Sequence, residues 1–298
     1  MTSIRRFLEQ SASRHADNWR DFRATSGKLP GLGTIDAWRH ERMYAVIEPL
    51  LTAVPGARWL TLGDGRFGSD AQYLAKKGAS ALASDVDPTL LKEAQQRGWI
   101  REYSAENAEA LSFADDSFDY VLCKESFHHF PRPWHAFHEM LRVCRDAVAL
   151  IEPQDRHAHQ SLLSALGASV KNLARLLLGK GDGSHDFEDS GNYVYALSRR
   201  EVEKAALGVN RRWVAFREFN VLYVPAWSGK PASSSSPTFL AFRLLTAVLD
   251  AMAAIGVWKG NVLAALVFKT SLGDEHVAAL RRAGFSVKQL PANPYIQD

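Results

Sequence analysis

Short apolar runs alternate with amphipathic segments along the first half of the chain. Trp59–Leu62 is an apolar run of strand length, followed by the glycine-rich turn Gly63–Gly68 and by the amphipathic segment Ser69–Lys77. A second apolar run, Ala79–Ser84, ends in an acidic residue, Asp85. This order predicts a βαβ unit, in which a helix connects two parallel strands.

The alternation continues towards the C-terminus. Further strands are expected at Ile100–Ser104, Phe118–Cys123, Ala147–Glu152, Trp213–Val224 and Asn261–Thr270. Further helices are expected after Thr34, at Pro88–Gly98, Trp134–Val143, Ser161–Leu178, Leu197–Gly208, Phe239–Trp258 and Asp274–Ala283. The apolar helix Phe239–Trp258 contains Arg243 and Asp250, so we expect a buried helix rather than a membrane span. Strands that alternate with helices predict an α/β fold.

The glycine-rich turn indicates a nucleoside site. Glycines allow the backbone to approach a ligand closely, and the helix that follows presents unpaired N–H groups there. Asp85 lies about twenty residues after Gly63, where a strand-end carboxylate can bind two ribose hydroxyls. Gly63, Gly65 and Gly68 also have the spacing of a dinucleotide site, so the turn alone does not identify the nucleoside.

Two later blocks resolve this choice. Asn107–Phe130 and Glu139–Pro153 resemble the later motifs of class I S-adenosylmethionine-dependent methyltransferases, and the block order matches over Trp59–Pro153. The resemblance implies a Rossmann-like, mostly parallel seven-stranded sheet with helices on both faces and helical caps. It also implies S-adenosylmethionine as cofactor and S-adenosylhomocysteine as product. By resemblance, the cofactor residues are Leu62, Gly63, Asp64, Gly65, Gly68, Asp85, Val86, Asn107, Ala108, Glu109 and Lys124.

The chain departs from the family pattern at three positions. Thr61 replaces the usual acid before the first glycine, Phe67 replaces the third glycine, and Asn107 replaces the acid beside the adenine. Asp64 is the candidate to substitute for the acid at position 61.

The catalytic candidates follow the fourth expected strand. His128 and His129 lie where the resemblance places the methyl group, and an imidazole can accept the proton of a hydroxyl acceptor near neutral pH. In the family the second position often packs structurally, so we expect His128 to be the base, with Glu125 to orient it or to bind a hydroxyl. The substrate-binding candidates are Glu152, Asp155 and Arg39. A solvated helix face is an alternative for Arg39.

The segments around the core predict one domain over residues 1–298. It would consist of an N-terminal helical cap at 1–33, a cofactor-binding core at 34–153, an inserted lid at 154–197 and the rest of the sheet at 198–298. The Leu-rich helix Ser161–Leu178 is expected to be a core or lid helix, with contact to a membrane surface as the alternative. In the loop Gly179–Asn192, the side chains His185, Asp186, Glu188 and Asp189 form either a divalent-ion site or a flexible acidic loop; we expect the latter and no metal.

The composition limits the kinds of binding partner and the cellular compartment to be expected. A net charge of +3, spread along the chain, is too small to indicate nucleic acid binding. Cys123 and Cys144 have no disulfide or metal spacing, and the N-terminus lacks the apolar core of a secretory signal, so we expect a cytoplasmic protein.

The function expected is O-methylation of a sugar hydroxyl in a surface glycan or its precursor, such as an O-antigen, and the glycan rests on resemblance alone. The alternatives are methylation of another small molecule, including an amine, or a non-catalytic protein that retains the fold. A nicotinamide-dependent oxidoreductase has less support, because the later motifs would have no role in it. Residue patterns do not indicate an oligomeric state.

Overall fold

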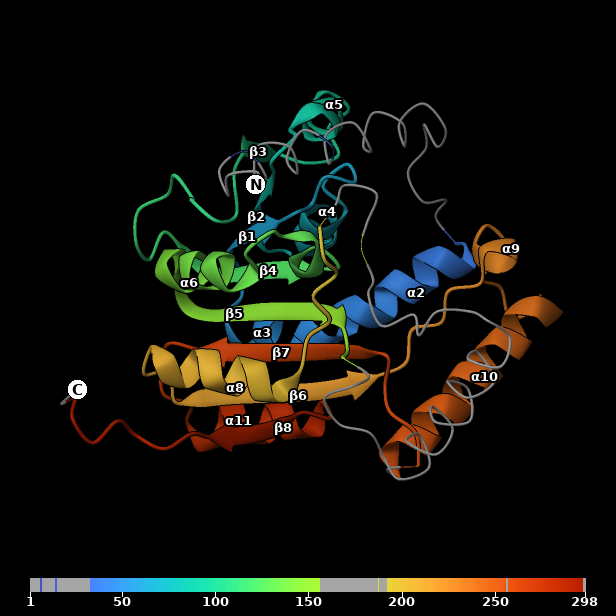
Figure 1. Ribbon diagram of the computed structural model, residues 1–298. Helices are drawn as coiled ribbons and strands as arrows, with labels where there is room; N and C mark the ends of the chain where they lie inside the picture. Colours follow the sequence, from blue (N-terminus) through green and yellow to red (C-terminus); the bar gives the residue numbers. More distant parts are fainter. Residues whose placement is uncertain are drawn as a thin grey trace.

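The computed structural model describes residues 6, 14, 33–155, 187, 192–255 and 257–296 (Figure 1). In these residues eight strands form one sheet with the order β3-β2-β1-β4-β5-β7-β6-β8. The strands are β1 Arg58–Leu62, β2 Ser80–Asp85, β3 Glu102–Ala105, β4 Phe118–Lys124, β5 Cys144–Pro153, β6 Trp213–Phe219, β7 Val262–Phe268 and β8 Ser286–Gln289.

The sheet is mostly parallel. Strands β1 to β5 are mutually parallel, whereas β7 is antiparallel to both β5 and β6, and β8 is antiparallel to β6. The α/β, Rossmann-like architecture is therefore confirmed. The expected number of seven strands is wrong, because the C-terminal run adds β8 at the edge beside β6.

Helices cover both faces of the sheet (Figure 1). The helical elements are α2 Ile35–Tyr44, η1 Ala45–Ile47, α3 Glu48–Ala53, α4 Ser69–Lys76, α5 Thr89–Gln96, η2 Phe127–His129, α6 Pro133–Val143, α8 Arg199–Gly208, α9 Pro225–Ser228, α10 Pro237–Ala254 and α11 Asp274–Arg282. Helices α6 and α8 pack on one face, and η1, α3 and α11 pack on the other. Every residue of β7 is buried, as expected for a strand covered on both faces.

Most of the expected caps lie outside the described residues. This applies to nearly all of residues 1–33, to the helix expected at Ser161–Leu178 and to the candidate ion ligands His185, Asp186, Glu188 and Asp189. Within the described part, the capping box of α8 is present, with Ser198 and Glu201 bonded reciprocally.

The expectation that the apolar helix near residue 250 is buried is wrong. In α10 only Phe239, Phe242 and Thr246 are buried, and the helix lies beside the sheet rather than over it (Figure 1). Strand β6 also ends at Phe219, earlier than expected. Beyond it, the Asn220 N–H donates to Asp250 Oδ1 at 2.9 Å, so the chain leaves the sheet to meet α10.

Candidate functional site

A cavity of about 310 Å³ opens at the carboxyl ends of β1 to β4 and is closed on one side by α2. This is the edge at which open α/β sheets bind ligands. Its lining residues are Arg39, His40, Leu62, Gly63, Asp64, Arg66, Ser69, Asp70, Asp85, Val86, Glu106, Asn107, Ala108, Glu109, Lys124, Glu125, Ser126, His129, Phe130, Pro131 and Asn192. Most of the predicted cofactor residues are thus brought together.

The turn after β1 is shaped by its own packing. Gly63 has φ +69°, and a Cβ there would lie 2.4 Å from Ser126 Cβ, so only glycine fits. Ser126 Oγ donates to the Gly63 carbonyl at 2.9 Å. Gly68 also has positive φ, and a Cβ there would meet Ile100. Gly65 and Gly68 do not line the cavity, so the structure does not support the expectation that they contact the cofactor. Gly68 packs against Ile100 and Ala83 instead.

Asp64 stabilises this turn. Its two carboxylate oxygens accept from the Asp70 N–H at 3.0 Å and the Ala71 N–H at 2.9 Å, in the first turn of α4. The hydroxyl of Thr61 donates to the same carboxylate at 2.8 Å. The N-cap residue of α4, Gly68, has no side chain, so Asp64 supplies the acceptor that an N-cap side chain usually provides.

Asp85 ends β2 and is almost fully buried beside the cavity. Burial raises the pKa of its carboxyl to about 7, and the nearby Asp87 carboxylate also raises it. Backbone N–H groups of Asp87, Gly65 and Val86 act in the opposite direction. A carboxyl at this position can accept hydrogen bonds from two vicinal hydroxyls.

The cavity continues over β3. Val86, Asn107 and Ala108 line this part and offer an apolar and amide surface to a flat ring. Glu109 also lines it, but its carboxylate accepts from the Arg132 N–H at 2.6 Å and from Arg132 Nε at 2.7 Å. Glu109 therefore anchors the neighbouring loop.

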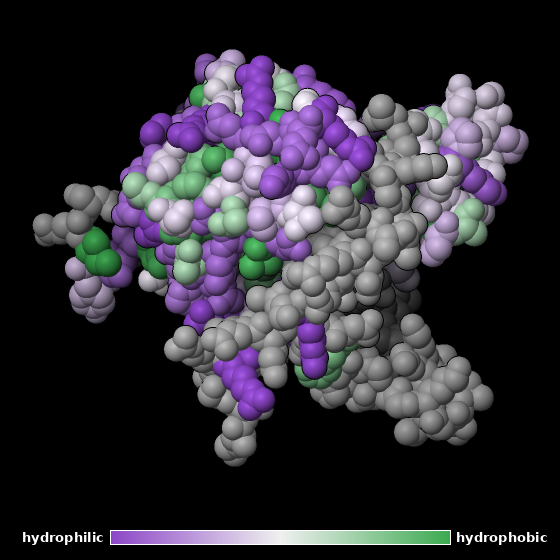
Figure 2. All heavy atoms as spheres, turned by 90° about the horizontal axis from the view of Figure 1, so that it is seen from above, coloured by the Kyte–Doolittle hydropathy of each residue, from purple (hydrophilic) through white to green (hydrophobic). Residues whose placement is uncertain are grey.

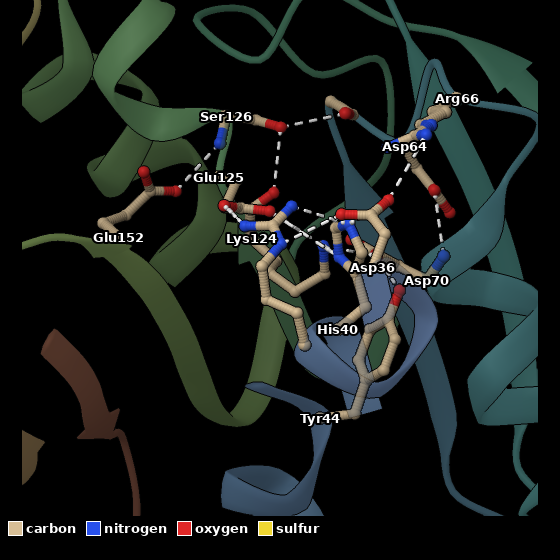
Figure 3. Close-up of polar contacts among 12 residues, drawn as sticks. Asp36, His40, Tyr44, Asp64, Arg66, Asp70, Lys124, Glu125, Ser126 and Glu152 are labelled. Atoms are coloured by element: carbon tan, nitrogen blue, oxygen red, sulfur yellow. Dashed lines mark hydrogen bonds and ion pairs between the residues drawn. The ribbon is translucent and has the colours of Figure 1, made fainter. Parts of the chain in front are cut away.

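A buried ionic network forms the other end of the cavity (Figure 3). Lys124 Nζ lies 3.2 Å from Asp70 Oδ1, which also accepts from the Tyr44 hydroxyl at 2.6 Å. Burial would lower the pKa of Lys124, but Asp70 and Glu125 raise it, so the ammonium stays charged. Burial and the Asp70 carboxylate raise the pKa of Asp64.

Helix α2 adds a second set of charges to this network (Figure 3). Arg39 Nη1 donates to Glu125 Oε1 at 3.2 Å, and Arg39 Nε donates to Asp36 at 3.1 Å. Burial would raise the pKa of Glu125, but Lys124 and Arg39 lower it to about 2. Burial, Lys124 and Arg39 lower the pKa of His40 to about 2, so its imidazole is neutral. These side chains compensate one another's charges. Arg39 therefore does not lie on a solvated face of α2, which was the alternative expected for it.

The two neighbouring histidines have opposite placements from those expected. His129 lines the cavity, whereas His128 does not. The Nδ1 atom of His128 lies 2.6 Å from Glu152 Oε2. The other Glu152 oxygen accepts from the Ser126 and Phe127 N–H groups at 3.0 and 2.9 Å. Glu152 is fully buried. Glu152 therefore holds the turn that carries His129. It does not line the cavity, where it was expected to bind the substrate.

Asp155 is also absent from the cavity wall among the described residues. Sequence reasoning missed other lining residues, among them His40, Arg66, Asp70 and Asn192. Asp36, His40 and Tyr44 recur every four residues on α2, so they lie along one side of the helix. That spacing was the available signal.

The donor set suits S-adenosylmethionine. Asp85 would hold the ribose, Val86 and Asn107 would hold the adenine, and the cations and carboxylates around Lys124 would hold the charged methionine end. Every one of these groups lines the same cavity.

Comparison with known proteins agrees with this geometry. A family described as "Methyltransferase domain" matches residues 60–151. An uncharacterised methyltransferase of Mycobacterium marinum is 35% identical over 186 residues, which cover 59% of this chain and 69% of that protein. This chain belongs to the S-adenosylmethionine-dependent methyltransferases. The methyltransferase core thus occupies the described sheet from β1 to β5.

Other relatives of this methyltransferase match over shorter stretches. An uncharacterised protein of Mycobacterium tuberculosis is 36% identical over 113 residues, 35% of this chain, and the match spans only 41% of that relative. A demethylmenaquinone methyltransferase of Renibacterium salmoninarum is 30% identical over 126 residues, 42% of this chain and 51% of that enzyme.

Solved structures share the fold. The Burkholderia thailandensis 1,6-didemethyltoxoflavin-N1-methyltransferase, solved with S-adenosylhomocysteine, has a TM-score of 0.53 at 13% identity, over 91% of this chain and 92% of its own. A phosphoethanolamine N-methyltransferase of Haemonchus contortus, in complex with S-adenosyl-L-methionine, has a TM-score of 0.51 at 16% identity, over 85% of this chain and 60% of its own.

Proposed function

We propose that this methyltransferase binds S-adenosylmethionine in the cavity above β1 to β4 and methylates a hydroxyl group of a neutral small molecule. The observation that carries the proposal is the position of His129, which lines the same cavity as Asp85 and Lys124. A sugar hydroxyl of a glycan precursor is the acceptor to test first. This acceptor rests on the resemblance of the sequence to methyltransferases associated with surface polysaccharides.

The proposed role of each residue follows from the chemistry of its side chain. S-adenosylmethionine supplies a methyl group that is already activated for displacement by a nucleophile. Asp85 and Lys124 would hold the two ends of the cofactor and so position it for transfer. His129 accepts the proton of the acceptor hydroxyl, a role that typically contributes about 10²–10⁴-fold. His128 and Glu152 position it by fixing the turn.

A neutral acceptor fits the charge balance of the cavity. The cations Arg39, Arg66 and Lys124 are paired with the carboxylates of Asp36, Asp70 and Glu125. This pairing leaves little net field for an ammonium or a carboxylate substrate. The alternatives from the sequence, an amine acceptor and a non-catalytic cofactor-binding protein, remain as outcomes of the experiment below.

The experiment compares His129→Gln with His128→Gln in a methyl-transfer assay on a panel of sugars and phenols, with S-adenosylhomocysteine affinity measured by calorimetry. We expect His129→Gln to lower kcat about 10²-fold or more with unchanged cofactor affinity. His128→Gln should mainly lower thermal stability, because it removes the partner of a buried carboxylate. Normal turnover in His129→Gln would exclude the base role. Cofactor binding without transfer to any acceptor would favour the non-catalytic alternative.

A further inference from the structure

The outward face of α10 is apolar along its whole length. Residues Phe239, Phe242 and Thr246 face the protein. The side chains on the opposite side are Leu240, Leu244, Leu245, Val248 and Ile255, here called the α10 stripe, and Leu244 and Ile255 are 68% and 75% exposed. Their spacing of about four residues places them on one side of the helix.

This stripe differs from an ordinary protein surface. The face seen in Figure 2, which lies over β3 and α5, is mostly hydrophilic with small hydrophobic patches among its described residues. Single exposed apolar side chains are common, whereas a contiguous exposed apolar surface usually marks an interaction site. Val257 and Trp258, also exposed, extend the apolar surface beyond the end of the helix.

A groove of about 490 Å³ runs along this surface between α2 and α10, with Trp38, Leu240 and Leu244 among its walls. Its charged residues are Arg42, Arg243 and Asp250. Arg42 Nη2 pairs with Asp250 at 2.6 Å, so this pair is neutral.

The charge that remains at the stripe is positive. Within the described residues Arg243 has no ion pair, and its guanidinium lies 5.7 Å from the centre of the Phe239 ring. Lys259 follows Trp258 just past the end of α10. A cationic rim beside an apolar face complements a surface that is anionic outside and apolar inside.

We propose that the α10 stripe docks this methyltransferase on an anionic lipid bilayer, with the apolar side chains in the interface and Arg243 and Lys259 at the headgroups. The helix lies on the membrane rather than across it. Its 18 residues are long and apolar enough to cross a membrane, but Thr246 and neighbouring side chains bury one face of the helix against the protein. Phe239 and Phe242 also hold its inner face against Trp38 of α2.

A second copy of the chain is a poorer occupant. A symmetric contact would use the same face of both copies and would bring the cations Arg243 and Lys259 of both to one surface. The carboxylate nearest in the groove, Asp250, is already paired with Arg42. Lipid phosphates supply the missing negative charge.

Docking by α10 would place the catalytic cavity near the bilayer. On α2, Trp38 and Arg42 line the groove, whereas Arg39 and His40 line the cavity. The same helix therefore separates the docking surface from the proposed active site.

Vesicle flotation of the full chain tests this proposal. Vesicles of phosphatidylcholine with about one-third phosphatidylglycerol should bind the protein, and pure phosphatidylcholine should bind it several-fold less, since each cation near an anionic surface contributes about fivefold. The double variant Leu244→Gln/Ile255→Gln should lose at least about tenfold in partitioning. The matched control Ile296→Gln, at another exposed isoleucine, should not change it.

The charge is tested separately. Arg243→Glu should lower binding to the anionic vesicles, whereas Arg101→Glu, at an exposed site beside β3, should leave it near the wild-type value. Because these side chains are exposed, the variants should keep the wild-type melting temperature. If the apolar variant is unstable, Arg243→Glu and loss of binding in salt still decide the question.

Three results would overturn the proposal. They are wild-type flotation of both α10 variants, equal binding to neutral and anionic vesicles, or no vesicle binding together with a dimer that Leu244→Gln/Ile255→Gln dissociates. The last would show that a second copy covers the stripe.

Discussion

Replacing Asp85 by asparagine separates two consequences of burying a carboxyl at the tip of β2. The side chain is almost fully buried, and burial raises the pKa of this carboxyl to about 7. Asparagine keeps the shape and one acceptor oxygen but removes the charge. The substitution should therefore change how stability depends on pH and should weaken cofactor binding.

The sign and size of the change in stability with pH follow from the linkage between proton binding and folding. A carboxyl with a raised pKa in the folded state contributes stability that is present below its unfolded pKa of about 3.9 and is lost as pH rises through about 7. Between about pH 5 and about pH 8 this loss is about 2.5 kcal/mol for Asp85. Asp85→Asn lacks it, so the free energy of unfolding of the variant should rise relative to that of the wild type by this amount over that range.

Urea unfolding at a series of pH values measures the difference directly. Parallel stability curves for variant and wild type would refute the buried, raised-pKa carboxyl. The same samples can be titrated with S-adenosylhomocysteine. Wild-type affinity should increase with pH up to about 7, and Asp85→Asn should bind about 1.5–3 kcal/mol more weakly with little pH dependence. Equal affinity would show that Asp85 does not contact the ribose.

Two further predictions concern the turn and the ionic network. Gly63→Ala should destabilise the protein by more than about 2 kcal/mol, because the new Cβ would collide with a side chain at a residue with positive φ. The control Gly78→Ala, at a residue with positive φ but open space around it, should cost about 1–2 kcal/mol. Equal losses of stability in urea unfolding would contradict the collision. In a double-mutant cycle on the free energy of unfolding, Asp70→Asn and Lys124→Met should couple by about 2 kcal/mol, because each single change leaves a buried partner uncompensated. Additive effects would show that this ion pair is not energetically important.

The sequence predicted the central part of the fold because that part is encoded locally. The predicted strands Trp59–Leu62 and Ala79–Ser84 begin and end within one residue of β1 and β2. Gly63 and Asp85 were predicted at the cavity because the ends of parallel strands share one edge of the sheet. Both line it.

Features that depend on distant residues were not predictable in this way. The choice between His128 and His129 is made by Glu152, 24 residues away in the chain from His128. Periodicity shows that α10 has apolar faces, but it does not show whether another segment covers them. The requirement for glycine at position 63 comes from Ser126, which follows the neighbouring strand β4 and lies 63 residues further along the chain.

The contact between Thr61 and Asp64 constrains which substitutions this buried turn can accept. The carboxylate that the resembled family carries at position 61 is replaced here by Thr61, which donates to Asp64. Restoring an acid at position 61 would place a third carboxylate beside Asp64 and Asp70 in a buried space, where like charges repel strongly. We therefore expect an acid at position 61 to be deleterious while Asp64 is present, and to be tolerated only where Asp64 is also replaced.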